Sequence, residues 1–187
     1  NKNGSEALKA GYFIDCTGDA DLAYMAGVPM QESGGRPLQP MSTYFILGGV
    51  DTESPLIEAA MHHNRQGENC HCLPVRKRLL ELREALDTPE FGGPGSCTTL
   101  QPGTVSVNMT RTAGNACDNR DFNRAECELR EQVFRMAAVL REHFPEFRNS
   151  YVSAVSTTAG IRETRRIKGM HVITGREYVD AFRYGDS

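Results

Sequence analysis

The chain has 187 residues, a net charge of −3 and an isoelectric point near 6.0. Because it has no surplus of basic residues, we expect no binding to nucleic acid. A content of 39% hydrophobic and 24% charged residues is typical of a soluble globular protein, and the longest apolar runs are too short to cross a membrane. The polar first ten residues show no secretory signal, so we expect a cytoplasmic protein that keeps its six cysteines reduced.

The first part of the chain predicts a strand, a tight turn and a short helix. A compact apolar run ending at Ile14 is typical of a buried strand, which we place over residues 7–16. A helix over residues 19–27 follows, with Asp19 as its N-terminal cap and Gly27 as the left-handed residue that ends it.

The turn between this strand and this helix allows two interpretations. Acidic side chains at a helix N-terminus contribute about 0.3–1 kcal/mol each, and such capping accounts for Asp19 and Asp21. Capping does not account for Gly18, which leaves a gap for another molecule, or for Asp15 at the strand end, where ligands of α/β sheets bind. Carboxylates at that place would accept hydrogen bonds from sugar hydroxyls and would repel phosphate.

The middle of the chain predicts further strands and helices. The loops are 31–40 and 87–103, the strands are 41–50 and 103–111, and the helices are 54–67, 74–86 and 123–144. The last helix has the clearest amphipathic pattern, an apolar stripe made of Leu129, Val133, Met136 and Leu140.

The last part of the chain begins with a strand, a turn and a second extended segment over residues 151–174. Thr174 and Glu177 have the spacing of a capping box, which predicts a helix over residues 174–182. Because strands and helices do not alternate regularly, the predicted fold class is α+β. No GxGxxG motif follows a strand, so we expect no complete dinucleotide-binding fold.

The segment GIRETRRIKG, residues 160–169, is unusually basic. Between its two glycines it carries Arg162, Arg165, Arg166 and Lys168. Most such runs are solvated charged faces. Arginine predominates here, however, and its planar guanidinium makes bidentate contacts with carboxylates, phosphates and planar anionic rings. Anion binding is therefore the second interpretation.

Two segments, FIDCTGDADLAYMAGVP at 13–29 and GIRETRRIKGMHVIT at 160–174, closely resemble a family of FAD-dependent oxidoreductases. GTVSVNMTR and EFRNSYV are similar to that family too, so the resemblance spans nearly the whole chain. It implies a middle fragment of a longer enzyme. Residues 1–30 would be a partial, Rossmann-like FAD-binding portion, 31–155 an inserted cap or substrate domain with an antiparallel sheet, and 156–187 a return segment.

The resemblance also implies cofactor contacts in the first segment. Thr17 and Gly18 would lie against the FAD, near its diphosphate or ribose. Asp19 would cap the helix and reach a hydroxyl of the cofactor. The phosphate-binding GxGxxG motif would lie outside this chain, so we expect that the chain alone does not retain FAD and is inactive.

The basic segment would return toward the flavin. Arg162 would contact the cofactor, and Arg165 and Arg166 are candidates for the isoalloxazine ring or an anionic substrate, where a cation stabilises reduced flavin. Glu163 would orient an arginine. The implied reaction is hydride or electron transfer with a small organic substrate, and the partners are that substrate and the remainder of the parent chain. No catalytic residue is identified.

Two other functions compete with this interpretation. One is a non-enzymatic interaction module whose arginines bind an anionic ligand. The other is a zinc site in the segment that holds His62, His63, Cys70, His71 and Cys72. Because Cys70 and Cys72 lack the spacing of a zinc knuckle, we predict no metal. A strand left without neighbours at 7–15 would offer an edge to a second copy, so a homodimer is a further option.

Overall fold

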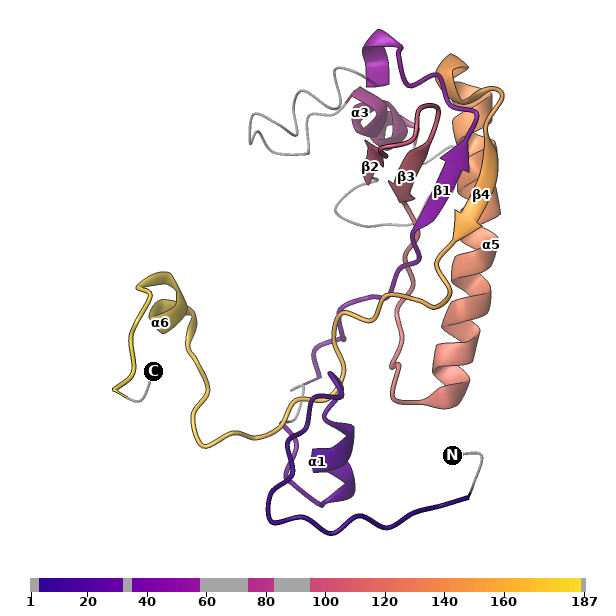
Figure 1. Ribbon diagram of the computed structural model, residues 1–187. Helices are drawn as coiled ribbons and strands as arrows, with labels where there is room; N and C mark the ends of the chain where they lie inside the picture. Colours follow the sequence, from indigo (N-terminus) through magenta and orange to yellow (C-terminus); the bar gives the residue numbers. More distant parts are fainter. Residues whose placement is uncertain (1–3, 32–34, 58–73, 83–94, 186–187) are drawn as a thin grey trace. The chain divides into compact units, whose positions relative to one another are not determined.

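The computed structural model describes residues 4–31, 35–57, 74–82 and 95–185 (Figure 1). The chain divides into two compact units. Unit 1 joins Asn1–Arg36 to Arg165–Ser187, and unit 2 is Pro37–Thr164. Unit 1 contains the helices α1 (Asp21–Met25) and α6 (Gly175–Val179). The elements of unit 2 are β1 (Phe45–Gly48), α3 (Pro74–Glu81), β2 (Gly95–Thr98), β3 (Val105–Asn108), α5 (Asn119–His143), the 3-10 helix η2 (Pro145–Phe147) and β4 (Tyr151–Val155).

Unit 2 is built on a four-stranded antiparallel sheet with the strand order β2-β3-β1-β4. In the centre of the sheet, Phe45 pairs with Val107 and Leu47 pairs with Val105. Successive residues of a strand point to opposite faces, so these four side chains share one face, and all four are buried. This sheet together with its helices confirms the α+β prediction.

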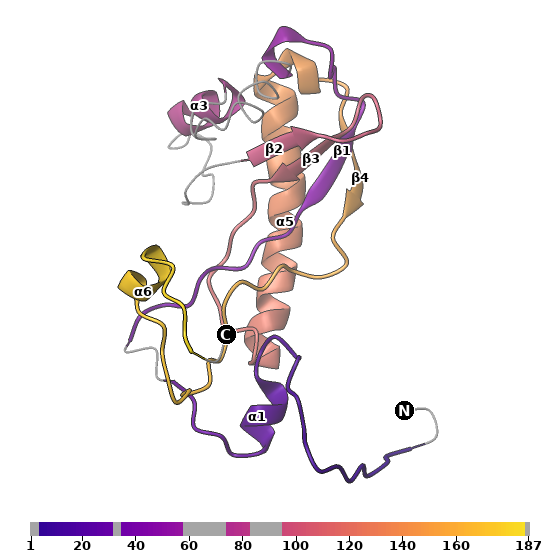
Figure 2. The same ribbon diagram turned by 60° about the vertical axis from the view of Figure 1, so that its left-hand side comes forward.

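The helix α5 covers that apolar face, and Figures 1 and 2 show it running along one side of the sheet. All four residues of the predicted stripe are at most 1% exposed. The helix begins earlier than predicted because Asp118 is its cap and accepts hydrogen bonds from the amides of Arg120 and Asp121. Val133, Met136 and Leu140 pack into the core with the sheet, whereas Leu129 joins a second cluster around Met41.

Two sequence-based assignments are wrong. Residues 7–16 are not a strand in the structure, and Tyr12 and Ile14 are 93% and 84% exposed. A strand needs a neighbour to take its hydrogen bonds, and this segment pairs with no strand among the described residues. Conversely, the predicted loop 87–103 contains β2, which pairs with β3 from Gly95↔Asn108 to Thr98↔Val105.

Two predicted helices fall partly outside the described residues. In the helix predicted over 54–67, the structure describes only the first turn, where Ser54 Oγ accepts a hydrogen bond from the Ile57 amide. The helix predicted over 74–86 is confirmed as α3, with Leu79 buried. The segment rich in histidine and cysteine, residues 62–72, lies outside the described part of the chain.

Unit 1 differs from unit 2 in the burial of its residues and in the length of its helices. None of its described residues is buried, and its two helices have five residues each. The predicted capping box of α6 is confirmed: Thr174 Oγ1 accepts from the Glu177 amide, and Glu177 accepts from the Thr174 amide. Over both units, no helix in the described part of the chain combines the length and the apolar character that a membrane span needs.

Candidate active site

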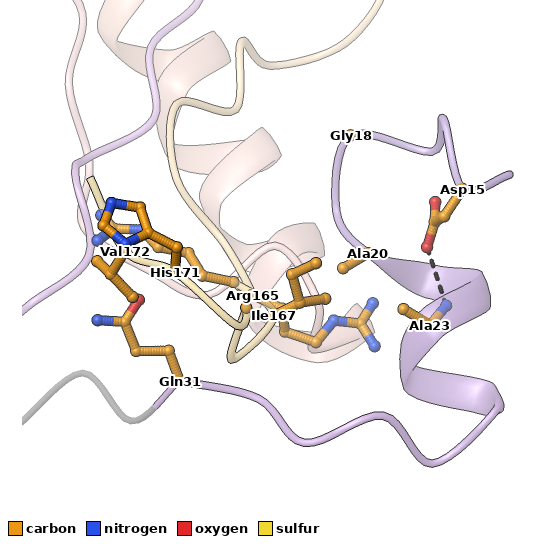
Figure 3. Close-up of a pocket in the computed structure, with 11 residues that line it drawn as sticks. Asp15, Gly18, Ala20, Ala23, Gln31, Arg165, Ile167, His171 and Val172 are labelled. Atoms are coloured by element: carbon orange, nitrogen blue, oxygen red, sulfur yellow. Dashed lines mark hydrogen bonds between the residues drawn. The ribbon is translucent and has the colours of Figure 1, made fainter. Parts of the chain in front are cut away.

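A pocket of about 500 Å³ lies within unit 1 (Figure 3). It is lined by residues of the turn before α1, by Ala23 of α1, by Gln31, and by residues of the basic segment and of the three positions that follow it. Figure 3 shows Gln31 and His171 on one side of the pocket and Asp15 and Ala23 on the other, with Arg165 between them. The pocket therefore brings together parts of the chain that are more than a hundred residues apart in the sequence.

The turn before α1 is organised by Asp15 and Thr17, not by Asp19. Asp15 accepts hydrogen bonds from the amide and hydroxyl of Thr17 at 2.9 and 2.7 Å, and from the Ala23 amide at 2.9 Å. Thr17 Oγ1 accepts from the Asp21 amide at 2.9 Å. The residue at the cap position is Ala20, which has no side-chain oxygen, so the prediction of Asp19 as the cap is wrong. Thr17 and Asp15 satisfy the first amides of the helix in its place.

These hydrogen bonds determine the charge and the conformation of the turn. The Thr17 and Ala23 amides and the Thr17 hydroxyl lower the pKa of Asp15, so this carboxylate is ionised at neutral pH. Gly18 has a φ of +85°, which glycine adopts without strain. A Cβ on Gly18 would have open space around it, so glycine is required here by the backbone conformation and not by crowding.

The end of α1 and the basic segment lie side by side in unit 1. The Gln31 amide donates to the Arg166 carbonyl at 2.7 Å, and the Lys168 amide donates to the Pro29 carbonyl at 2.8 Å. Between these bonds, Met30 and Ile167 form an antiparallel bridge. This short ladder holds the arginines against the helix that follows the Thr-Gly turn.

Arg165 is the arginine most closely tied to α1. Its guanidinium forms an ion pair with Asp21 and stacks over the Tyr24 ring, 4.4 Å from the ring centroid. Its side chain is 22% exposed. Arg165 and Arg166 both line the pocket, so two of the predicted flavin-ring candidates lie beside Gly18, one of the predicted cofactor contacts.

Arg162 belongs to unit 2 and is held there by contacts of its own. Its guanidinium donates to the Pro40 carbonyl at 2.5 Å and to Ser42 Oγ at 2.6 Å. The neighbouring Glu163 accepts from the Gln39 amide at 2.9 Å. The segment RETRR is thus divided between the two units after Thr164.

Sequence reasoning missed His171 as a pocket residue. Its Nε2 lies 2.9 Å from the Tyr184 hydroxyl and 3.4 Å from Glu177 Oε1. Gln31 was missed as well. His171 lies within the second motif segment and Gln31 lies two residues after the first, but only the ladder between these segments shows that both line one pocket. Among the described residues, no group of three or more acidic, histidine or cysteine side chains is arranged to hold a metal ion.

Comparison with known proteins gives one informative result. No curated protein and no solved structure matches the chain. The family model described as FAD dependent oxidoreductase matches residues 1–187. The match covers both motifs and everything between them, and the chain therefore belongs to the FAD-dependent oxidoreductase family.

Proposed function

We propose that this chain is part of a flavoprotein oxidoreductase and that the pocket in unit 1 receives a portion of its FAD. The observation that carries this proposal is the pocket itself, which combines the Thr-Gly turn with the basic segment. Bound FAD would supply the acceptor for a hydride or electrons from a small organic substrate.

The residues around the pocket suit a ligand with both hydroxyl and anionic groups. Ionised Asp15 would accept hydrogen bonds from sugar hydroxyls, and the arginines would contact anionic groups, although Arg165 is already paired with Asp21. Gly18, Ala20 and Gly169 present little or no side chain, so a ligand can approach the backbone closely. Arg165 and Arg166 add positive charge. Thr17 would act on the cofactor through the shape of the turn, because its hydroxyl already donates to Asp15 and accepts from Asp21.

The two units would contribute differently to the enzyme. Unit 1 would belong to the FAD-binding portion and unit 2 would be the cap or substrate domain. In support, unit 2 has its own sheet and core, whereas unit 1 has no buried residue among those described. We infer that the remainder of a longer polypeptide covers unit 1, and that the chain alone binds FAD poorly.

A pair of glycine variants tests the site. In the protein extended at both ends, Gly18→Val should abolish retention of FAD, measured as the flavin absorption bands per mole of purified protein. Gly27→Val is the matched control: Gly27 also has a positive φ, of +75°, with open space at its Cβ, yet it does not line the pocket. Backbone strain is therefore similar in the two variants, and only the first alters the pocket.

The possible outcomes separate the alternatives. Loss of flavin in Gly18→Val but not in Gly27→Val supports the proposed site. Equal loss in both variants would mean that strain in the α1 region, not contact with FAD, is responsible. An extended wild-type protein that folds but takes up no FAD would contradict the flavoprotein proposal and leave an anion-binding module as the remaining function.

A further inference from the structure

His171 connects the pocket to a cluster of side chains at α6. Its Nε2 lies 2.9 Å from the Tyr184 hydroxyl, and the two rings meet edge to face with centroids 5.2 Å apart. Glu177 Oε1 lies 3.4 Å from the same nitrogen. Three ionisable groups thus meet, of which His171 lines the pocket, and neither the family match nor the two motifs assigns them a role.

Glu177 is the fixed negative charge of this cluster. Its Oε2 accepts hydrogen bonds from the Thr174 amide at 2.7 Å and from Thr174 Oγ1 at 2.8 Å. These bonds, with smaller contributions from Tyr184 and His171, lower the pKa of Glu177. An ionised carboxylate only accepts hydrogen bonds, so its neighbours must donate to it.

The direction of the remaining hydrogen bonds follows from this charge. Tyr184 is hydrogen-bonded to Glu177, and partial burial together with that carboxylate raises the pKa of Tyr184. The phenol therefore keeps its proton at neutral pH and donates it to Glu177. Because the Tyr184 oxygen can then only accept from the imidazole, the proton of neutral His171 belongs on Nε2.

This arrangement leaves the other ring nitrogen available. Nδ1 of His171 carries the lone pair, and it has no hydrogen-bond partner in the part of the chain that the structure describes. The charged groups that share the pocket with it are Asp15, Arg165 and Arg166. A carboxylate that fixes one imidazole nitrogen and leaves the other basic is the arrangement of a general base.

We propose that His171 is the proton acceptor of this pocket, with Tyr184 and Glu177 as positioning residues. The inference rests on the proposed function, in which FAD occupies the same pocket. The substrate class that it implies is an alcohol or amine. In its oxidation, His171 Nδ1 would take the proton of the O–H or N–H bond, and bound FAD would supply the acceptor for the hydride of the C–H bond. A C=O or C=N bond forms, and the imidazole becomes imidazolium.

The test measures the midpoint potential of the bound flavin against pH in the FAD-loaded, extended protein, so no substrate needs to be known. If His171 takes up a proton when the flavin gains negative charge, the potential depends more steeply on pH in the region of that uptake than it does without it. His171→Gln protein, measured after saturation with FAD, should lose this steeper region. His143→Gln, which removes the imidazole that ends α5 in unit 2, is the matched control and should keep it.

Glu177→Gln distinguishes a positioning role from a structural one. Glutamine at this position still completes a capping box with Thr174, so α6 is retained. The variant removes the negative charge beside the imidazole, so the steeper region should move to lower pH. Loss of structure alone would lower the FAD content instead of moving this region.

Three results bear on the inference. A steeper region that disappears in His171→Gln and moves in Glu177→Gln supports it. Wild-type protein with bound FAD whose pH dependence is the same as that of His171→Gln would overturn the inference while leaving the flavoprotein proposal intact. Extended wild-type protein that binds no FAD would overturn both.

Discussion

Units 1 and 2 differ in how their apolar side chains are placed. Every buried hydrophobic residue that the structure describes belongs to unit 2. In unit 1 the large apolar side chains are at the surface, including Tyr12, Ile14, Met25 and Val179, each at least 80% exposed. Burial of apolar surface is the main favourable term in folding, at about 25 cal/mol per Å². Among the described residues, unit 2 has this stabilisation from fully buried apolar side chains and unit 1 does not.

Unit 1 is instead organised by local polar contacts. Asp15 holds the start of α1, the Thr174–Glu177 capping box holds the start of α6, and the Arg165–Asp21 ion pair joins the two ends of the unit. Exposed contacts of this kind contribute little each, because water competes for the same groups. Unit 1, which holds the candidate site, therefore has less to stabilise it than unit 2, as is usual for regions that bind ligands.

The largest expected effect comes from the core of unit 2. Phe45→Ala removes a ring that is 1% exposed and packs beneath α5, so it should lower the free energy of unfolding by about 3–5 kcal/mol. Phe13→Ala in unit 1 is the matched control: its ring is 63% exposed, and the change should stay within about 0.5 kcal/mol. Denaturant unfolding followed by circular dichroism measures both. Equal losses in the two variants would contradict the contrast between the units.

A smaller effect is expected from the helix caps. Asp118→Ala leaves the first amides of α5 without their acceptor and should cost about 0.5–2 kcal/mol in global stability, because α5 carries much of the core. Thr174→Ala removes an equivalent acceptor from α6, which buries no residue. Its effect should appear as faster amide exchange within α6 with an unchanged denaturation midpoint. A changed midpoint would show that α6 is coupled to the core.

The sequence predicts best those helices and strands whose apolar residues recur with a regular helical or strand period. The stripe of α5 repeats over several turns, and the alternation of Val105 and Val107 identifies β3. β2 was missed because glycine and proline surround it and its order depends on pairing with β3. The segment ending at Ile14 has the composition of a buried strand, but composition does not show whether a neighbouring strand is present to pair with it.

For the candidate site, the motifs identified the right segments but not all the right side chains. Gly18, Arg165 and Arg166 do line one pocket. Asp19 was chosen as the cap by its position, yet Asp15 reaches the Ala23 amide eight residues later because the chain reverses through Gly18. His171 lies in the second motif segment, but its place in the pocket beside the turn before α1 depends on the ladder between residues 29–31 and 166–168. Such a contact between distant segments leaves no trace in local spacing.

Acid should affect the short helices of unit 1 before the buried core of α5, although Asp121 at the start of α5 also has a lowered pKa. The pKa values of Asp15 and Glu177 are both lowered, chiefly by the Thr17 and Thr174 amides. Their stabilising contribution is therefore complete above the unfolded values of about 3.9 and 4.3, and it is lost as the pH falls through the lower folded values. Amide chemical shifts of α1 and α6 between about pH 5 and pH 2.5 should change while those of the α5 core do not. Earlier changes in the α5 core would contradict this order.

A substitution at Ile14 tests whether the rest of a longer polypeptide covers unit 1. Ile14 is 84% exposed, so Ile14→Ser should change the stability of this chain by less than about 0.5 kcal/mol. If the remainder of a longer polypeptide covers residues 7–16, the same substitution in the extended protein removes a buried side chain and should cost about 1.5–3 kcal/mol. Leu100→Ser, on a fully exposed residue of unit 2, should be neutral in both proteins. Denaturant unfolding of all four variants measures the difference. A neutral Ile14→Ser in the extended protein would mean that nothing covers this segment, and the exposed apolar surface of unit 1 would then require another explanation.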